Sequence, residues 1–165
     1  MTQVARAETQ FEVEIQTEIN GEPVRRAVKS RQHLADFVRD EMGLTGTHTG
    51  CEHGVCGSCS ILLDGSVVRG CLVLAAQADG KRVETIEGMS ERGALRELQA
   101  EFIRRNAAQC GFCTSGMLLT ASELLTQHQH LSRQEIREFM SGNFCRCTGY
   151  EAIIDAVESV MNRRK

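Results

Sequence analysis

Hydrophobic and polar residues alternate one by one near the start of the chain. Phe11, Val13 and Ile15 are each followed by a charged or polar residue, and this period of two is typical of a half-buried strand. The pair Asn20-Gly21 then predicts a tight hairpin turn. The other elements expected in this half are a returning strand over 24–28, a helix with Leu34, Phe37 and Val38 that ends before Gly43, and strands over 61–63, 67–68 and 82–86. This order predicts a small mixed sheet with one helix packed on it.

Beyond Glu87 the hydrophobic residues recur at steps of three and four, the spacing of amphipathic helices. They fall into four groups, which are Leu95 to Ile103, Met117 to Leu125, Ile136 to Phe139 and Ile153 to Val160. Ser132 with Glu135, and Thr148 with Glu151, form capping-box patterns before the last two groups. We therefore expect an α+β protein, with a sheet-containing domain over residues 1–87. A compact bundle of four helices, each about 10 to 18 residues long, would occupy residues 88–165.

The composition is that of a globular protein and narrows the possible partners. The chain has 165 residues, of which 41% are hydrophobic and 25% charged, with a formal net charge of −3. This charge and the lack of a basic stripe argue against nucleic-acid binding. No apolar run reaches the roughly 18 residues that span a membrane. Met1–Gln10 is polar and lacks the apolar stretch of a signal peptide, so we expect a cytoplasmic protein.

Cysteine is the exceptional residue in this composition. The eight cysteines form two groups of four, Cys51, Cys56, Cys59 and Cys71, then Cys110, Cys113, Cys145 and Cys147. In a secreted protein an even number would suggest disulfides. In the cytoplasm thiols stay reduced, so metal binding is the better interpretation. Each half of the chain is small for a stable core, and a metal site in each would stabilise its fold.

The first group has the spacing C-x4-C-x2-C followed by a later cysteine, which is the plant-type 2Fe–2S pattern. Gly50, Gly54 and Gly57 lie among these cysteines, and glycine lets a tight loop wrap closely round a small cluster. Zinc also binds four thiolates but usually takes two C-x2-C pairs, so an iron–sulfur cluster is favoured. His53 could be a ligand, as in Rieske centres, but because Cys71 is available we expect it to face solvent or a partner.

The second group has the spacing C-x2-C-x31-C-x-C. Cys110 and Cys113 precede one expected helix, and Cys145 and Cys147 precede another. Free N–H groups and the partial positive charge at helix N-termini stabilise thiolates and an anionic cluster. The close C-x-C pair favours iron, although this group by itself leaves zinc open. A disulfide of the thioredoxin type between Cys110 and Cys113 has no other support in the sequence.

The two groups together resemble a known family. The segments CEHGVCGSC, with Cys71 after it, and QCGFC…GNFCRCTGY are similar to the small iron–sulfur subunit of the molybdenum hydroxylases. This is the family of xanthine oxidase and carbon monoxide dehydrogenase. The resemblance runs from about Phe11 to Val160. Phe144 stands where leucine is usual, which leaves the cysteine ligands unchanged.

The resemblance implies a fold, cofactors and partners. The fold would be a β-grasp, ferredoxin-like N-terminal domain followed by a C-terminal four-helix bundle, each with one 2Fe–2S cluster. A large subunit would hold molybdenum and a pyranopterin dinucleotide, a medium subunit would hold FAD, and two such heterotrimers would form a dimer. Gln109 matches the family position that contacts the pyranopterin, and Cys147 matches the ligand that leads from the cluster to it. Gly111 and Gly149 match tight turns beside them.

The resulting hypothesis is an electron-transfer subunit of an oxidoreductase, without a catalytic centre of its own. The sequence contains no evident Ser–His–Asp or Cys–His arrangement, and Glu91, Glu97 and Glu101 are expected on solvated helix faces. Electrons from substrate oxidation at molybdenum would pass through both clusters to FAD, or to a cytochrome as in some relatives. The alternative is a free-standing two-cluster carrier resembling ferredoxin. The substrate is not encoded in this chain.

Overall fold

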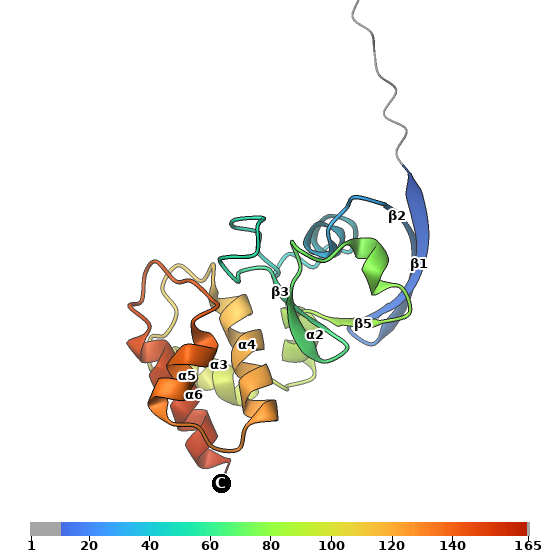
Figure 1. Ribbon diagram of the computed structural model, residues 1–165. Helices are drawn as coiled ribbons and strands as arrows, with labels where there is room; N and C mark the ends of the chain where they lie inside the picture. Colours follow the sequence, from blue (N-terminus) through green and yellow to red (C-terminus); the bar gives the residue numbers. More distant parts are fainter. Residues whose placement is uncertain (1–10, 165) are drawn as a thin grey trace, which may run out of the picture.

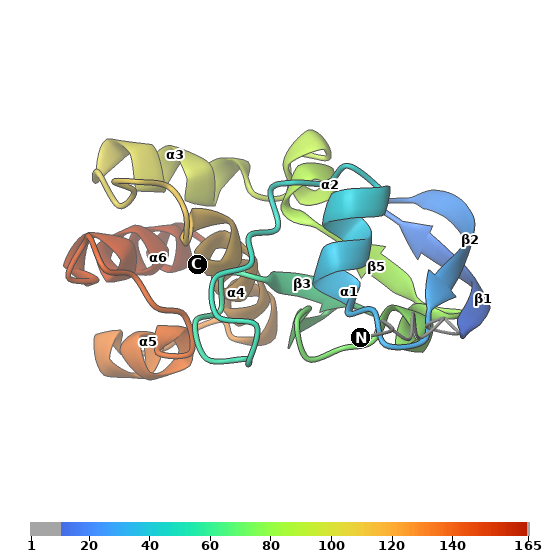
Figure 2. The same cartoon turned by 90° about the horizontal axis from the view of Figure 1, so that it is seen from above.

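The structure, a computed structural model, describes residues 11–164. Its strands form one five-stranded sheet, and the longer helices lie together beside that sheet (Figure 1). The segment 44–59, which carries three of the cysteines, passes between these two parts (Figure 2). The polar segment Met1–Gln10, which bears on the expectation of a chain without a signal peptide, lies outside the described residues.

The sheet is built from two hairpins and one central strand. β1 (Glu12–Ile19) and β2 (Glu22–Lys29) form the first hairpin, and β3 (Ser60–Leu63) and β4 (Ser66–Arg69) form the second. β5 (Arg82–Glu84) lies between them, parallel to β1 and antiparallel to β3, so the strand order is β2-β1-β5-β3-β4. The mixed sheet expected from the sequence is therefore confirmed.

Both hairpin turns use left-handed backbone conformations. Asn20 and Gly21 have φ angles of +54° and +91°, and Asp64 and Gly65 have +50° and +85°. A type I′ turn requires positive φ at both central residues, which asparagine, aspartate and glycine tolerate better than other residues do. The hairpin turn that the sequence predicts at Asn20-Gly21 is therefore present in the structure.

One face of the sheet packs against short helical segments. α1 (Leu34–Asp36) continues into the π-helical turn η1 (Phe37–Glu41), and the 3-10 turn η2 (Ala75–Ala78) precedes β5. The buried core of this part consists of Ile15, Ile19, Val28, Leu34, Phe37, Val38, Ile61, Ala75, Ala78 and Val83. The period-two pattern also places Phe11 and Val13 on the core face. In the structure both side chains are exposed, and they lie at or just before the start of β1, beyond the residues of this core.

The remaining helices share a second core. They are α2 (Ile86–Glu91), α3 (Arg96–Arg104), α4 (Thr114–Gln127), α5 (Arg133–Met140) and α6 (Glu151–Arg163). Their buried side chains include Leu98 of α3, Leu124 of α4, Ile136 of α5 and Val157 of α6. Within residues 11–164 the structure contains no helix with the length and apolar character needed to cross a membrane.

The boundaries differ from the sequence prediction at three elements. β5 ends at Glu84, and Ile86 begins the short helix α2 instead of ending a strand, because its side chain packs against the helical core. α3 has 9 residues and α5 has 8, so both are shorter than expected. The periodicity predicts that a helix exists more reliably than it predicts where the helix ends.

One of the two predicted capping boxes is confirmed and the other is wrong. Ser132 accepts from the N–H of Glu135 and the Glu135 side chain accepts from the N–H of Ser132, which forms the expected box. At α6, however, the residue before the helix is Tyr150, with φ of +70°. Thr148 lies too far back to cap the helix, and Glu151 forms ion pairs with arginines of α5 instead.

The expectation that Glu101 lies on a solvated helix face is also wrong. Its residue surface is only 4% exposed. The carboxylate accepts hydrogen bonds from Arg104, Arg105 and Arg163, the last on α6. These guanidinium groups, first among them Arg104, lower the pKa of Glu101 to about 2. Glu101 therefore joins α3 to the end of α6 through a charged hydrogen-bond network.

Candidate metal centres

The first cysteine set consists of Cys51, Cys56, Cys59 and Cys71. Three of them lie on the loop between η1 and β3, and the fourth follows β4. The loop turns tightly because Gly54 and Gly57 adopt φ angles of +84° and +75°, which other residues rarely adopt. Within it, the Cys56 N–H donates to the Cys51 sulfur at 3.4 Å. The sequence pattern and the fold thus bring all four thiols to one end of the sheet.

The second cysteine set consists of Cys110, Cys113, Cys145 and Cys147. The first pair lies just before α4 and the second pair lies between α5 and α6. Gly111 and Gly149 have φ angles of +84° and +64°, so the tight turns expected at both positions are present. The thiols come from segments more than thirty residues apart, yet the sulfurs of Cys110 and Cys147 lie 3.6 Å from one another.

The sulfurs of each set approach one another in pairs. The Cys110 and Cys147 sulfurs are within contact distance. The pKa values of Cys51, Cys71 and Cys113 are each shifted in part by a second thiol of the same set, that of Cys56, Cys59 and Cys145 respectively. Two thiolates bound to one tetrahedral metal at about 2.3 Å would lie about 3.8 Å apart. The 3.6 Å separation of Cys110 and Cys147 is close to this value.

The grouping of the thiols in twos fits a binuclear cluster. A 2Fe–2S cluster has two irons, and each iron takes two thiolates. All eight cysteines are free thiols, so the Cys110–Cys113 disulfide is not formed. Both sets therefore suit a 2Fe–2S cluster.

The surroundings of the thiols shift their pKa values in both directions. Hydrogen bonding from the His53 backbone lowers the pKa of Cys51 to about 6, whereas burial raises the pKa of Cys71 to about 11. Burial also raises the pKa of Cys113 to about 12. Burial acts in the same way on Cys145, but hydrogen bonds to its sulfur outweigh it and the pKa is lowered. Four adjacent thiolates repel one another, so each set is fully deprotonated most readily around a cationic core.

Two residues outside the predicted sets of ligands hold Cys145. The Cys145 N–H donates to the Tyr150 hydroxyl at 2.9 Å, and the Thr148 hydroxyl donates to the Cys145 sulfur at 3.1 Å. Tyr150 is the single tyrosine of the chain, and it directly follows the C-R-C-T-G segment. Its place directly after the cysteine motif is the feature of the sequence that could have identified Tyr150 as part of the site.

The loops that carry the two sets are in direct contact. The Phe144 N–H donates to the Cys56 carbonyl oxygen at 2.8 Å, which places one hydrogen bond between ligand-bearing segments of the two sets. The backbones also approach closely at Gly116 of α4, where an added Cβ would lie 2.3 Å from the carbonyl oxygen of Gly57. Glycine at position 116 is therefore a requirement of the contact between the helices and the first cysteine loop.

A buried asparagine reinforces this contact. Asn143 is 1% exposed, and its Nδ2 donates to the Gly57 carbonyl oxygen at 3.2 Å. Its Oδ1 accepts from Thr120 of α4 at 3.1 Å and from Arg69 of β4 at 3.2 Å. Arg69 also donates to the Gly142 carbonyl oxygen at 2.6 Å. Sequence spacing does not reveal this network, because its members are brought together only by the fold.

Histidines contribute contacts beside the cysteines rather than a metal-binding array. The His48 ring stacks on Phe112, with ring centroids 4.8 Å apart, and its Nδ1 lies 2.8 Å from the Phe112 carbonyl oxygen. His53 is exposed, as the sequence predicts, and its ring contacts the Cys51 carbonyl oxygen. His48 thus adds a further link between the first loop and the second cysteine set.

The two sets differ in their access to the surface. Cys59 and Cys71 are buried, whereas Cys110 and Cys147 are exposed. Gln109, which precedes Cys110, is exposed as well. The second set therefore has an open edge, formed by Gln109, Cys110 and Cys147, that is available to a partner.

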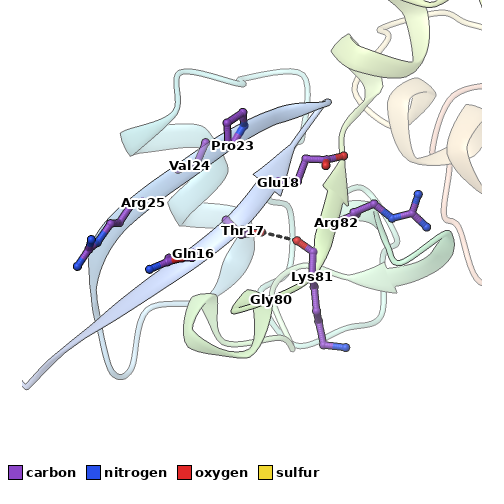
Figure 3. Close-up of a pocket in the computed structure, with 9 residues that line it drawn as sticks. All are labelled: Gln16, Thr17, Glu18, Pro23, Val24, Arg25, Gly80, Lys81 and Arg82. Atoms are coloured by element: carbon purple, nitrogen blue, oxygen red, sulfur yellow. Dashed lines mark hydrogen bonds between the residues drawn. The ribbon is translucent and has the colours of Figure 1, made fainter.

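A separate hollow of about 460 Å³ lies on the sheet (Figure 3). It is lined by Gln16, Thr17, Glu18, Pro23, Val24, Arg25, Gly80, Lys81 and Arg82. Thr17 donates to the Lys81 carbonyl oxygen, and the charged groups of Arg25 and Lys81 pair with Glu14 and Asp64 outside the hollow. Its lining contains neither cysteine nor histidine.

Two family models match the chain, one over each cysteine set. The model of the 2Fe-2S iron-sulfur cluster binding domain matches residues 17–87, and that of the 2Fe-2S binding domain matches residues 85–158. The first region contains Cys51 to Cys71 and the second contains Cys110 to Cys147. The chain is therefore a 2Fe–2S iron–sulfur protein, and a zinc scaffold is not favoured.

Similar proteins are subunits of oxidoreductases. The chain is 52% identical over 145 residues to caffeine dehydrogenase subunit gamma of Pseudomonas sp. (strain CBB1), covering 86% of this chain and 87% of that protein. It is also 52% identical over 145 residues to the nicotine 6-hydroxylase small subunit of Paenarthrobacter nicotinovorans, covering 88% and 87%. The solved structure of quinoline 2-oxidoreductase from Pseudomonas putida 86 contains a chain with 53% identity and a TM-score of 0.86, covering 93% of this chain and 96% of that one.

These matches extend over both cysteine sets and nearly the whole length of the relatives. The relatives are subunits of larger enzymes, so the electron-transfer role within an oxidoreductase complex is confirmed, and a free-standing carrier is not favoured. The combination of two 2Fe–2S domains in one small subunit is what the sequence resemblance implies. The chain belongs to the family of small iron–sulfur subunits of the molybdenum hydroxylases.

Proposed function

We propose that this chain relays electrons from a molybdenum–pyranopterin centre on a large subunit to FAD on a medium subunit. The first cysteine set would hold one 2Fe–2S cluster and the second set would hold the other. When bound, such clusters supply one-electron oxidation and reduction. The chain itself binds them, fixes their separation and controls which of them faces a partner.

The observation that carries the proposal is the contact between the two cysteine loops. Phe144 directly precedes Cys145, and its N–H donates to the carbonyl oxygen of Cys56 at 2.8 Å. Covalent bonds and this single hydrogen bond therefore connect a proposed ligand of one cluster to a proposed ligand of the other. Two unrelated metal sites would not need such a connection, whereas two steps of one relay would.

The exposure of the second set supports its place at the molybdenum end. Cys110 and Cys147 are exposed and Gln109 lies beside them, so a partner can reach this cluster through its open edge. We assign Gln109 and Cys147 to contact with the pyranopterin, through the Gln109 amide and the Cys147 sulfur. The amide of Gln109 can both donate and accept hydrogen bonds, which suits the polar edge of a pterin.

The proposed assembly is a dimer of heterotrimers in the cytoplasm. Each heterotrimer would contain this chain, the large molybdenum subunit and the medium FAD subunit, and a cytochrome would be the alternative acceptor to FAD. Copurification tests the assembly: a tagged chain should recover both partners in equal amounts, with molybdenum and FAD bound. Recovery of this chain alone from cells that produce all three would contradict it.

We also propose that the fold divides into two domains. We assign residues 1–87 to a β-grasp, ferredoxin-like domain and residues 88–165 to a four-helix bundle of the kind found in this family. Support for the bundle comes from α3, α4, α5 and α6, which share one core. Support for the β-grasp comes from the mixed sheet with α1 and η1 packed on it.

For the substrate of the complex we propose an N-heteroaromatic compound. Three relatives at 52% or 53% identity are named for caffeine, nicotine and quinoline, each of which contains nitrogen in a ring. The test compares rates of dye reduction by the purified complex with a panel of purines, pyridines and quinolines and a panel of aldehydes. Turnover of aldehydes alone would overturn this proposal while leaving the relay unaffected.

A further inference from the structure

The Cys145 sulfur accepts a hydrogen bond from a side-chain hydroxyl. Thr148 Oγ1 lies 3.1 Å from Cys145 Sγ and donates to it. The Tyr150 N–H donates to the same threonine oxygen at 3.2 Å, so the hydroxyl hydrogen is left to point at sulfur. The Tyr150 hydroxyl in turn accepts from the Cys145 N–H at 2.9 Å. The three residues form a closed ring of hydrogen bonds around one proposed cluster ligand.

The backbone holds this ring in place. Gly149 and Tyr150 have φ angles of +64° and +70°, and the second of these is unusual for a residue with a bulky side chain. Such a conformation persists where the surroundings fix it. Here the Tyr150 ring packs against the helical core while its hydroxyl is bound to Cys145. The Thr148 hydroxyl is therefore positioned by the fold and does not rotate freely at the surface.

A fixed donor to a ligand sulfur has a definite effect on reduction. Reduction adds one electron, and therefore one negative charge, to the cluster and its thiolates, and no proton needs to move. A hydrogen bond to sulfur is stronger when the sulfur carries more negative charge. It therefore stabilises the reduced state more than the oxidised state and raises the reduction potential.

We infer that Thr148 is a positioning residue that raises the reduction potential of the second cluster through its hydrogen bond to Cys145. The inference rests on the proposed ligation of that cluster by Cys145. Thr148 does not cap α6, which begins after Tyr150, and its hydroxyl hydrogen is free to point at sulfur. In the relay, a higher potential makes the second cluster a better acceptor for electrons that arrive from the molybdenum side.

The first cysteine set provides an internal reference. Its Cys51 sulfur accepts a hydrogen bond from the Cys56 N–H at 3.4 Å, and the backbones of His53 and Val55 also lower its pKa. Side-chain substitution at position 148 leaves these backbone donors in place. A change at Thr148 should therefore shift the potential of one cluster and not that of the other.

The experiment is a redox titration of the purified complex, with both clusters followed by electron paramagnetic resonance. The variants are Thr148→Val, which keeps the shape but removes the hydroxyl, Thr148→Ala, and Thr148→Ser, which keeps the hydroxyl. Thr126→Val is the matched control, because the Thr126 hydroxyl donates to a carbonyl oxygen on α4, away from both sets. Iron content and the number of signals are measured first and test the ligation itself.

The expected result is a lower midpoint for the second cluster in Thr148→Val and Thr148→Ala. We expect a change of roughly tenfold in the equilibrium constant for reduction, or about 59 mV for one electron. The first cluster, Thr148→Ser and Thr126→Val should keep wild-type midpoints. An unchanged midpoint in Thr148→Val, or an equal shift of both clusters, would overturn the inference while the ligation stands. Loss of the second cluster from both Val and Ala variants would also overturn it, because Thr148 would then serve assembly.

Discussion

Asn143 Nδ2 donates a hydrogen bond to the Gly57 carbonyl oxygen at 3.2 Å, across a sequence separation of 86 residues. Gly57 lies between Cys56 and Cys59, and Asn143 lies two residues before Cys145. The hydrogen bond therefore ties the loop of the first cysteine set to the loop of the second. This junction is one of the contacts that hold the two proposed cluster sites next to one another.

The first prediction concerns the junction directly. Asn143→Ala would leave the Gly57 carbonyl and the Thr120 hydroxyl without this partner in a buried site. We expect the free energy of unfolding to fall by about 1–3 kcal/mol, as measured by chemical denaturation. The matched control is Asn162→Ala on the exposed end of α6, which should be nearly neutral. Equal stability of the two variants would show that the junction contributes nothing.

The second prediction concerns the close approach of the backbones. In Gly116→Ala the new methyl group would lie 2.3 Å from the Gly57 carbonyl oxygen, so α4 and the first cysteine loop must move apart. We expect a loss of about 1–3 kcal/mol and a weaker magnetic interaction between the two reduced clusters. Gly65→Ala is the comparison, because no atom lies within 4 Å of its added methyl group. That variant should keep the wild-type interaction despite the cost of a positive φ angle.

Local features were predictable from the sequence, and features that join distant segments were not. The turn at Asn20-Gly21 and the cap at Ser132 depend on neighbouring residues, and both are present. Glu101 looks like an exposed helical residue, but it is buried against Arg163, which is 62 positions away. Sequence spacing carries no information about such a partner, because the packing of α3 on α6 creates the pair.

The candidate sites show the same division. Cysteine spacing alone predicts both sets of four, and the structure brings the members of each set together. Thr148 matches a capping pattern, yet the tight turn at Gly149 directs its hydroxyl to Cys145. From the sequence alone, the Thr148 hydroxyl could either cap the following helix or bind the Cys145 sulfur. The backbone geometry of the structure selects the second.

The third prediction is a pH dependence of stability that originates at Glu101. Its pKa is lowered from 4.5 to about 2 in the folded chain, so its ion pairs stabilise the fold fully above about pH 4.5. This stabilisation is lost as the pH falls from 4.5 towards 2. Wild type should therefore melt at a higher temperature than Glu101→Gln between pH 5 and 7, with a difference that shrinks below pH 4.5.

The comparison for this prediction is Glu97→Gln, on an exposed part of the same helix. Cluster loss in acid affects all three proteins, so the differences between their melting temperatures isolate the carboxylates. A difference between wild type and Glu101→Gln that stays constant down to pH 3 would rule out the assignment of this pH dependence to Glu101.

The fourth prediction breaks the proposed relay at each end. Cys147→Ala should remove the second cluster, so that substrate no longer reduces FAD although the first cluster keeps its signal. Cys51→Ala should remove the first cluster, so that substrate reduces the second cluster but electrons stop there. Rapid mixing of the complex with substrate, followed by absorption and electron paramagnetic resonance, distinguishes the two variants. FAD reduction at the normal rate in Cys147→Ala would show that electrons take another path.

The most direct test of the two-cluster assignment is chemical and spectroscopic analysis of the purified chain in its complex. We predict roughly four irons and four acid-labile sulfides per chain, since each 2Fe–2S cluster contains two of each. After reduction we predict two distinguishable 2Fe–2S signals by electron paramagnetic resonance, one from Cys51, Cys56, Cys59 and Cys71 and one from Cys110, Cys113, Cys145 and Cys147. Stoichiometric zinc, or a single cluster signal from protein with its full iron content, would contradict the assignment.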